Sequence, residues 1–145
     1  MKKLFLVILS LFAGISMLYG APENWLTNYD AAMKQAAKEK KAVLVLFTGS
    51  DWCPGCIALK QHTLSNEKFL AFAKENLVLV YMDSPRRTPQ SAEMRSEVVK
   101  LYRKLDPGPY IPATVIVGND GRILGRIPGF RNADDYIKEI RKVIK

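Results

Sequence analysis

The sequence predicts an α/β fold in which a mixed four-stranded sheet is covered by helices on both faces. Short apolar runs rich in β-forming residues alternate with amphipathic stretches at helical spacing. The turn signal Asn119-Asp120-Gly121 lies between the last two apolar runs and predicts a hairpin. A chain of 145 residues provides one hydrophobic core rather than two. We expect the early strands, joined through helices, to be parallel and the last two to be antiparallel.

The first half of the domain is expected to alternate helix and strand. Apolar residues recur at helical spacing from Trp25 onward and predict an amphipathic helix over residues 24–40. The unbroken run Ala42–Phe47 predicts a buried central strand, and a helix is expected from Cys53 to about Thr63. Ser65-Asn66-Glu67 predicts the cap of a further helix. We expect that helix to point four apolar side chains inward, those of Phe69, Leu70, Phe72 and Ala73.

The second half begins with another strand and ends with a helix. Leu77–Met82 is apolar and predicts the second strand, and the polar segment 84–91 predicts a loop with two prolines. A helix is expected over Ala92–Leu105, with an apolar face formed by Val98, Leu101, Tyr102 and Leu105. The remaining elements are expected to be strand Ala113–Val117, strand Arg122–Ile127 and a helix at about 132–144.

Residues 1–20 predict a secretory signal peptide, which leaves residues 21–145 as the folded domain. Lys2 and Lys3 precede an apolar stretch from Leu4 to Leu18, and the composition then becomes polar. We expect Gly20 to be the last residue removed. An uncleaved membrane anchor is the alternative, although the apolar run is short for a bilayer span. The protein is therefore expected outside the cytoplasm, in the periplasm or an equivalent compartment.

The net charge of +8 does not by itself indicate a nucleic-acid site. The basic residues are spread along predicted helices and do not form a run interleaved with aromatic residues, so they predict a solvated surface. His62 is likewise expected to be exposed at a helix end, and Arg86-Arg87 to lie in a solvated loop; contact with a partner is the alternative for these arginines.

The segment Trp52-Cys53-Pro54-Gly55-Cys56 carries the predicted chemistry. Two cysteines at positions i and i+3 lie on one face of the first turn of a helix, close enough to form a disulfide. Cys53 at the helix N-terminus would be stabilised as a thiolate, and Pro54 suits the first helical position. We expect Cys53 to attack a substrate disulfide and Cys56, better shielded, to resolve the mixed disulfide.

Three other roles are open to a cysteine pair with this spacing. A structural zinc site needs four ligands as a rule, whereas the chain offers two cysteines and His62. A c-type haem attachment site requires histidine directly after Cys56, where Ile57 stands. A static disulfide is compatible with export, but so short a loop adds little stability. We expect no metal and no cofactor other than the redox-active disulfide.

With these motifs in place, residues 23–145 resemble the thioredoxin superfamily. The resemblance depends on the strand Ala42–Phe47, the Trp52–Cys56 motif and Ile111-Pro112 entering the third strand. It implies that Pro112 is cis and sits against the disulfide, and that the Ile111 backbone pairs with a substrate strand. An ordinary trans proline at a strand entrance is the alternative for Pro112. Trp52 would flank the sulfurs and shape the docking surface.

Two departures from the thioredoxin pattern stand out. Thioredoxins keep a buried acid in the first central strand, where this chain has Leu46 or Phe47, and the accompanying lysine is replaced by Leu79. Proton transfer at Cys56 must then use water or another group; Asp51 is expected to be only a solvated loop charge. The second departure is the Pro-Gly dipeptide between the cysteines, which lacks the histidine of strongly oxidising members and favours a reducing or intermediate potential.

These inferences predict an exported thiol–disulfide oxidoreductase, most simply a reductase. The expected partners are disulfide-containing exported proteins and a membrane electron donor, with no nucleic acid, and the protein is expected to be a monomer. Alternatives are a disulfide oxidase or isomerase of the same fold, and a non-catalytic adaptor that binds metal through Cys53 and Cys56.

Overall fold

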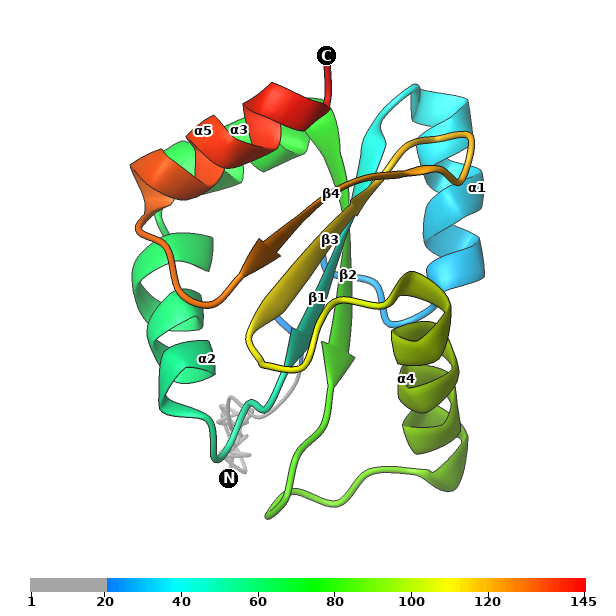
Figure 1. The fold of residues 1–145 in the computed structure, drawn as a ribbon, viewed down its shortest axis with the longest axis vertical. Coiled ribbons are helices and arrows are strands. Elements are labelled where there is room, and N and C mark those ends of the chain that lie inside the picture. The colour runs from blue at the N-terminus through cyan, green and yellow to red at the C-terminus, as the bar shows by residue number, and fades with distance from the viewer. Residues whose placement is uncertain (1–20) are drawn as a thin grey trace, which may run out of the picture.

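The computed structural model describes residues 21–145, which contain every predicted helix and strand (Figure 1). The predicted signal peptide, residues 1–20, lies outside the described residues. The observed elements are α1 (Tyr29–Glu39), β1 (Ala42–Thr48), α2 (Pro54–Leu59), the π-helical turn η1 (Lys60–Leu64), α3 (Glu67–Asn76), β2 (Leu77–Asp83), α4 (Ala92–Leu105), β3 (Ala113–Val117), β4 (Ile123–Pro128) and α5 (Ala133–Val143). Among residues 21–145, no helix is both long and apolar enough to cross a membrane.

The four strands form one mixed sheet, as the sequence predicts, and their order in it is β2-β1-β3-β4. β1 and β2 are parallel, and β3 and β4 form the antiparallel hairpin. β3 also runs antiparallel to β1, although a helix precedes it, so the expectation of parallel strands holds only for the first two. The reason is visible in Figure 1: the loop 84–91 extends beyond the end of β2, and α4 only brings the chain back to that same edge.

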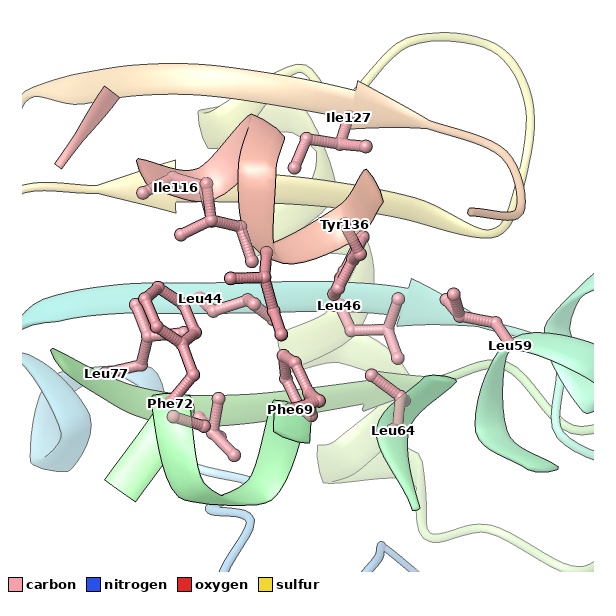
Figure 2. Packing of buried hydrophobic residues seen from close by; sticks show 14 of the residues in the cluster. Leu44, Leu46, Leu59, Leu64, Phe69, Phe72, Leu77, Ile116, Ile127 and Tyr136 are labelled. Atoms are coloured by element: carbon pink, nitrogen blue, oxygen red, sulfur yellow. The ribbon is translucent and has the colours of Figure 1, made fainter. Parts of the chain in front are cut away.

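Helices cover both faces of the sheet, as predicted, because side chains along each central strand alternate between two cores. Val43, Val45 and Phe47 of β1 pack with residues of α1 and α4. Leu44 and Leu46 point to the opposite face and pack against α2, α3 and α5 (Figure 2). β1 is thus buried on both faces, as its uninterrupted apolar run predicts.

The first helix is shorter than predicted. Asn28 caps α1 by accepting the Ala31 N–H at 2.8 Å, so the helix begins at Tyr29 rather than near residue 24. Residues 23–24 form a turn, and Leu26 forms an isolated parallel bridge with Val80. Leu26 therefore pairs with the β2 edge of the sheet, and the residues before Asn28 do not add a helical turn.

Two further expectations need correction. Leu70 is 46% exposed, while Phe69, Phe72 and Ala73 are buried, because position 70 falls beside the apolar stripe of α3 and not within it. The helix predicted from Cys53 to Thr63 starts at Pro54 and continues as the π-helical turn η1. The predicted cap of α3 is confirmed, because Asn66 Oδ1 accepts the Lys68 N–H at 3.0 Å.

Candidate functional site

Four loops meet at one edge of the sheet because of the strand directions. The pairs Thr48↔Asp83, Phe47↔Ala113 and Ala113↔Pro128 place the ends of β1, β2 and β4 beside the start of β3. The segments that follow or precede these residues, 49–53, 84–91, 106–112 and 129–132, therefore lie at this edge (Figure 1). Segment 49–53 leads into α2, and segment 129–132 contacts η1, where the Thr63 hydroxyl donates to the Arg131 carbonyl.

A disulfide joins Cys53 and Cys56 at the start of α2, with 5.2 Å between the Cα atoms. Cys53 is the N-cap residue, Pro54 occupies the first helical position, and the Cys56 backbone N–H points at Cys53 Sγ at 3.3 Å. An N–H donor at this place stabilises a thiolate on Cys53 when the disulfide is reduced. Both cysteines are buried, with exposed fractions of 6% for Cys53 and 3% for Cys56.

The loop before β3 lies against the disulfide. The Ile111–Pro112 peptide bond is cis, as the resemblance implies, and the Ile111 carbonyl oxygen is 3.8 Å from Cys53 Sγ. A Cβ atom on Gly55 would lie 3.4 Å from Pro112 Cδ, so the first turn of α2 packs against this proline. The Gly129 N–H donates to the Pro112 carbonyl at 2.8 Å and ties β4 to the same loop.

Trp52 links the cysteine segment to the loop after β2. Its indole Nε1–H donates to the Ser84 carbonyl at 2.8 Å, and the Arg86 guanidinium lies over the ring, with Cζ 3.6 Å from the centroid. Gly49 leaves space for the indole, since a Cβ there would fall 2.6 Å from Trp52 Cε2. Trp52 is half-buried.

Asp51 is buried and not the solvated loop charge that the sequence predicts. Its carboxylate accepts three backbone N–H groups, from Arg86 at 2.9 Å, Arg87 at 2.8 Å and Thr88 at 2.7 Å. These hydrogen bonds, led by the one from Arg86, lower the pKa of Asp51 to about 2. Asp51 therefore binds the loop 84–91 to the cysteine segment.

The loop after β2 is more involved in the site than the sequence indicates. The side chains of Arg86 and Arg87 are exposed, as expected, but their backbones are fixed by Asp51. Ser50 makes a second connection, donating its N–H and Oγ–H to Asp83 at 2.9 and 2.5 Å. An aspartate beside the cysteine motif and a polar loop after the next parallel strand were the available signals for this contact.

Cys56 borders a groove, and apolar residues stand where thioredoxins have a buried acid. Leu46, Phe47 and Leu79 are all buried among apolar residues, so the departure from the thioredoxin pattern is real. Cys56 Sγ accepts the Gly49 N–H at 3.4 Å. A groove of about 610 Å³ reaches Cys56, and its lining includes Ser50, Lys60 and Tyr81.

Neither His62 nor another cluster adds a metal-binding arrangement to the cysteines. His62 is exposed on η1, as predicted. Within the described part of the chain, no three His, Cys, Asp or Glu side chains gather closely enough to hold a metal ion. The arrangement at Cys53 and Cys56 is suited to thiol–disulfide exchange, since a dithiol and a disulfide interconvert there with little rearrangement.

Comparison with known sequences gives a consistent set of relatives. Residues 24–118 match the profile of a family described as thioredoxin-like. The chain is 28% identical over 121 residues to the disulfide bond reductase DsbH of Chlamydia pneumoniae, covering 81% of this chain and 71% of the relative. It is 25% identical over 117 residues to the thiol:disulfide interchange protein DsbD of Campylobacter jejuni, but spans only 19% of that protein.

Solved structures support the fold. A DsbH oxidoreductase superimposes with a TM-score of 0.74 and 24% sequence identity, covering 90% of this chain and 94% of that one. The reduced C-terminal domain of DsbD from Neisseria meningitidis gives a TM-score of 0.60 with 26% identity, covering 79% and 92% of the two chains.

Proposed function

This chain belongs to the thioredoxin-like family and is a thiol–disulfide oxidoreductase, and we propose that it reduces disulfides in exported proteins. The observation that carries the proposal is the Cys53–Cys56 pair at the start of α2, with an N–H donor on Cys53 Sγ and the Ile111 carbonyl beside it.

The reaction follows from this geometry in two exchanges. The Cys53 thiolate attacks one sulfur of a substrate disulfide, forming a mixed disulfide and releasing the other sulfur as a thiolate, which takes up a proton. Cys56, deprotonated, then attacks Cys53 Sγ; this forms the Cys53–Cys56 disulfide and releases the second substrate thiol. Two electrons pass to the substrate, and a donor dithiol must restore the reduced pair by the reverse exchanges.

The other predicted site residues would bind the substrate or fix the first turn of α2. Ile111 offers its backbone next to Cys53, where an extended substrate segment can pair with it, and Pro112 packs under the first turn. Trp52 would cover one side of the sulfurs. Pro54 and Gly55 would keep the first turn compact and close to Pro112.

The direction of electron flow is supported by two independent features. DsbH of Chlamydia pneumoniae, which this chain matches over most of both sequences, is described as a disulfide bond reductase. The dipeptide between the cysteines contains no histidine whose charge would further stabilise the reduced thiolate and make the pair strongly oxidising.

The location and the donor follow from the same argument. The signal peptide predicted over residues 1–20 supports a location outside the cytoplasm, where an oxidising environment would oblige a reductase to receive electrons. The similarity to part of DsbD, described as a thiol:disulfide interchange protein, supports a partner that exchanges thiols and disulfides, and we propose that the donor is a membrane protein of this kind. No cofactor is proposed, because the electrons would enter as a dithiol.

The reduction potential of the cysteine pair tests the proposal. The protein is equilibrated in glutathione or dithiothreitol buffers, and the redox state is followed by Trp52 fluorescence and by thiol alkylation. A value near about −270 mV is expected for a reductase, whereas a value near about −120 mV would make the protein a disulfide donor and overturn the proposed direction. The double variant Cys53→Ser/Cys56→Ser is the control, because it can form neither the disulfide nor a mixed disulfide with the buffer thiol, and its fluorescence should not follow the buffer.

A further inference from the structure

The exposed charge beside the disulfide comes from one loop. Within segments 49–53 and 84–91, the exposed charged side chains are those of Arg86 and Arg87. The carboxylate of Asp51 is buried under three backbone N–H groups, and the neighbouring Asp83 accepts hydrogen bonds from Ser50. A partner that approaches this side of Cys53 therefore meets positive charge.

Arg86 is held in place by two contacts, one through its backbone and one through its side chain. Its backbone N–H donates to Asp51 at 2.9 Å, and its guanidinium stacks on Trp52, with Cζ 3.6 Å from the ring centroid. The indole itself is fixed by its hydrogen bond to the Ser84 carbonyl. Among residues 21–145 the guanidinium forms no ion pair, so its charge is not neutralised within the described chain.

We propose that Arg86 selects substrate proteins that carry an acidic residue beside the cysteine attacked by Cys53, an inference that rests on the proposed function. A guanidinium stacked on an aromatic ring keeps its N–H edge free, and this edge matches a carboxylate in geometry. Because Asp51 fixes the Arg86 backbone and the stacking restricts its side chain, less conformational freedom remains to be lost on binding. Trp52 directly precedes Cys53 in the chain, so the substrate carboxylate would be bound on the Trp52 side of the reacting cysteine.

Two exposed aromatic side chains define the rest of the partner segment. Tyr110, 79% exposed, directly precedes Ile111, and Phe130, 42% exposed, directly follows Gly129, which is hydrogen-bonded to Pro112. Both lie on loops at the same edge of the sheet as Arg86. The occupant we infer is an extended, acidic and partly apolar segment of a substrate protein, paired with the Ile111 backbone.

Three peptide disulfides that differ only in the residue beside one cysteine test this inference. With Asp, Ala or Lys at that position, the reduced wild-type protein should reduce the Asp peptide about fivefold faster than the Lys peptide at low salt, with the difference shrinking at high salt. Arg86→Glu should reverse the order, and Arg86→Gln should abolish it. Near-UV circular dichroism establishes that each variant is folded.

Arg87→Glu is the matched control. Arg87 has the same charge, is equally exposed and also donates its backbone N–H to Asp51, but it has no aromatic contact among the described residues. The preference should persist in Arg87→Glu. If Arg87→Glu removes the preference as fully as Arg86→Glu, or if Arg86→Glu keeps the wild-type order, the role assigned to Arg86 is overturned.

The same peptides separate this inference from the proposed function. Equal reduction of all three peptides by the wild-type protein would overturn the selection by Arg86 and leave the reductase activity standing. Failure to reduce any of them would overturn the reductase, and the oxidised protein would then be tested on the corresponding dithiol peptides, since the same mixed disulfide forms in both directions. A preference for the Asp peptide in that assay would support selection by Arg86, and equal rates with all three peptides would overturn it.

Discussion

The segments 49–53 and 84–91 meet beside the disulfide but contribute to the site in different ways. The first contains the nucleophile and is short, since β1 leads almost directly into α2. The second has no reactive side chain, yet its backbone donates three N–H groups to Asp51 and its Arg86 stacks on Trp52. The difference teaches that reactive atoms and the surface around them can come from separate loops, joined here by one buried carboxylate.

The largest expected effect comes from removing either sulfur of the Cys53–Cys56 pair. Cys53→Ser should reduce disulfide reduction to the uncatalysed rate, because no nucleophile remains at the start of α2. Cys56→Ser should also stop turnover, but it should accumulate a mixed disulfide between Cys53 and the substrate. Insulin reduction measures the turnover, and mass spectrometry without reductant detects the trapped adduct. Trapping through Cys56 in Cys53→Ser would contradict the assignment of the two sulfurs.

A smaller effect is expected where the two segments touch through Gly49. Gly49→Ala would place a methyl group 2.6 Å from Trp52 Cε2, and the indole would have to move away from Ser84 and Arg86. We expect a loss of about 1–3 kcal/mol in the free energy of unfolding, measured by urea denaturation.

A double-mutant cycle sharpens this test. In a Trp52→Ala background the indole is absent, so Gly49→Ala should lower the free energy of unfolding much less than it does in the wild type. An equal cost in both backgrounds would show that the strain arises elsewhere.

The sequence predicted the cysteine motif well and its contact with segment 84–91 poorly, for a physical reason. Cys53, Pro54 and Cys56 act through local geometry, because a helix start and an i, i+3 spacing place them without reference to the rest of the chain. Hydrophobic patterning likewise predicted the order of helices and strands along the chain and the burial of β1. The contact between Asp51 and Arg86 joins residues far apart in the chain, and a charged residue in a loop has no pattern that distinguishes burial from exposure.

Leu70 and α1 illustrate the same limit within the fold. An apolar residue one position from the buried stripe of α3 looks like a core residue in the sequence, but the turn of the helix directs it outward. The segment before Asn28 has helical spacing, yet pairing of Leu26 with Val80 at the sheet edge outweighs that local preference. Hydrophobic spacing mispredicts a helix boundary where a contact with another part of the chain is stronger than the local helical preference.

Asp51→Asn tests the connection between the two segments. The folded-state pKa of Asp51, about 2, lies below its ordinary value of 3.8, so the ionised carboxylate stabilises the fold above pH 4. This contribution should disappear as the pH falls from about 4 to about 2. We therefore expect Asp51→Asn to be less stable than the wild type at pH 7 and nearly equal to it at pH 2, as measured by chemical denaturation.

Hydrogen exchange locates this effect. The amide protons of Arg86, Arg87 and Thr88 should exchange faster in Asp51→Asn, since they lose a charged acceptor. Asp134→Asn is the control, because Asp134 forms an exposed ion pair with Lys68 and should change stability little. Unchanged exchange at all three amides would mean that Asp51 does not hold the loop.

The smallest effect is expected at the groove beside Cys56, and it bears on where the proton goes. Burial, with the nearby charge of Asp83, raises the pKa of Tyr81 to about 12, so its hydroxyl stays protonated at neutral pH and cannot accept the Cys56 proton. Leu46 or Phe47 stands where thioredoxins place an acid, both are buried and apolar, and the groove reaches the buried Cys56. Tyr81→Phe should therefore change the rate of the Cys56 step by less than about twofold, whereas removing a general base would cost about 100-fold or more. Added imidazole should accelerate that step in both proteins, because a small external base can enter the groove. A large loss in Tyr81→Phe with a shifted pH profile would place the tyrosine hydroxyl in the proton path and make the groove a structural feature only.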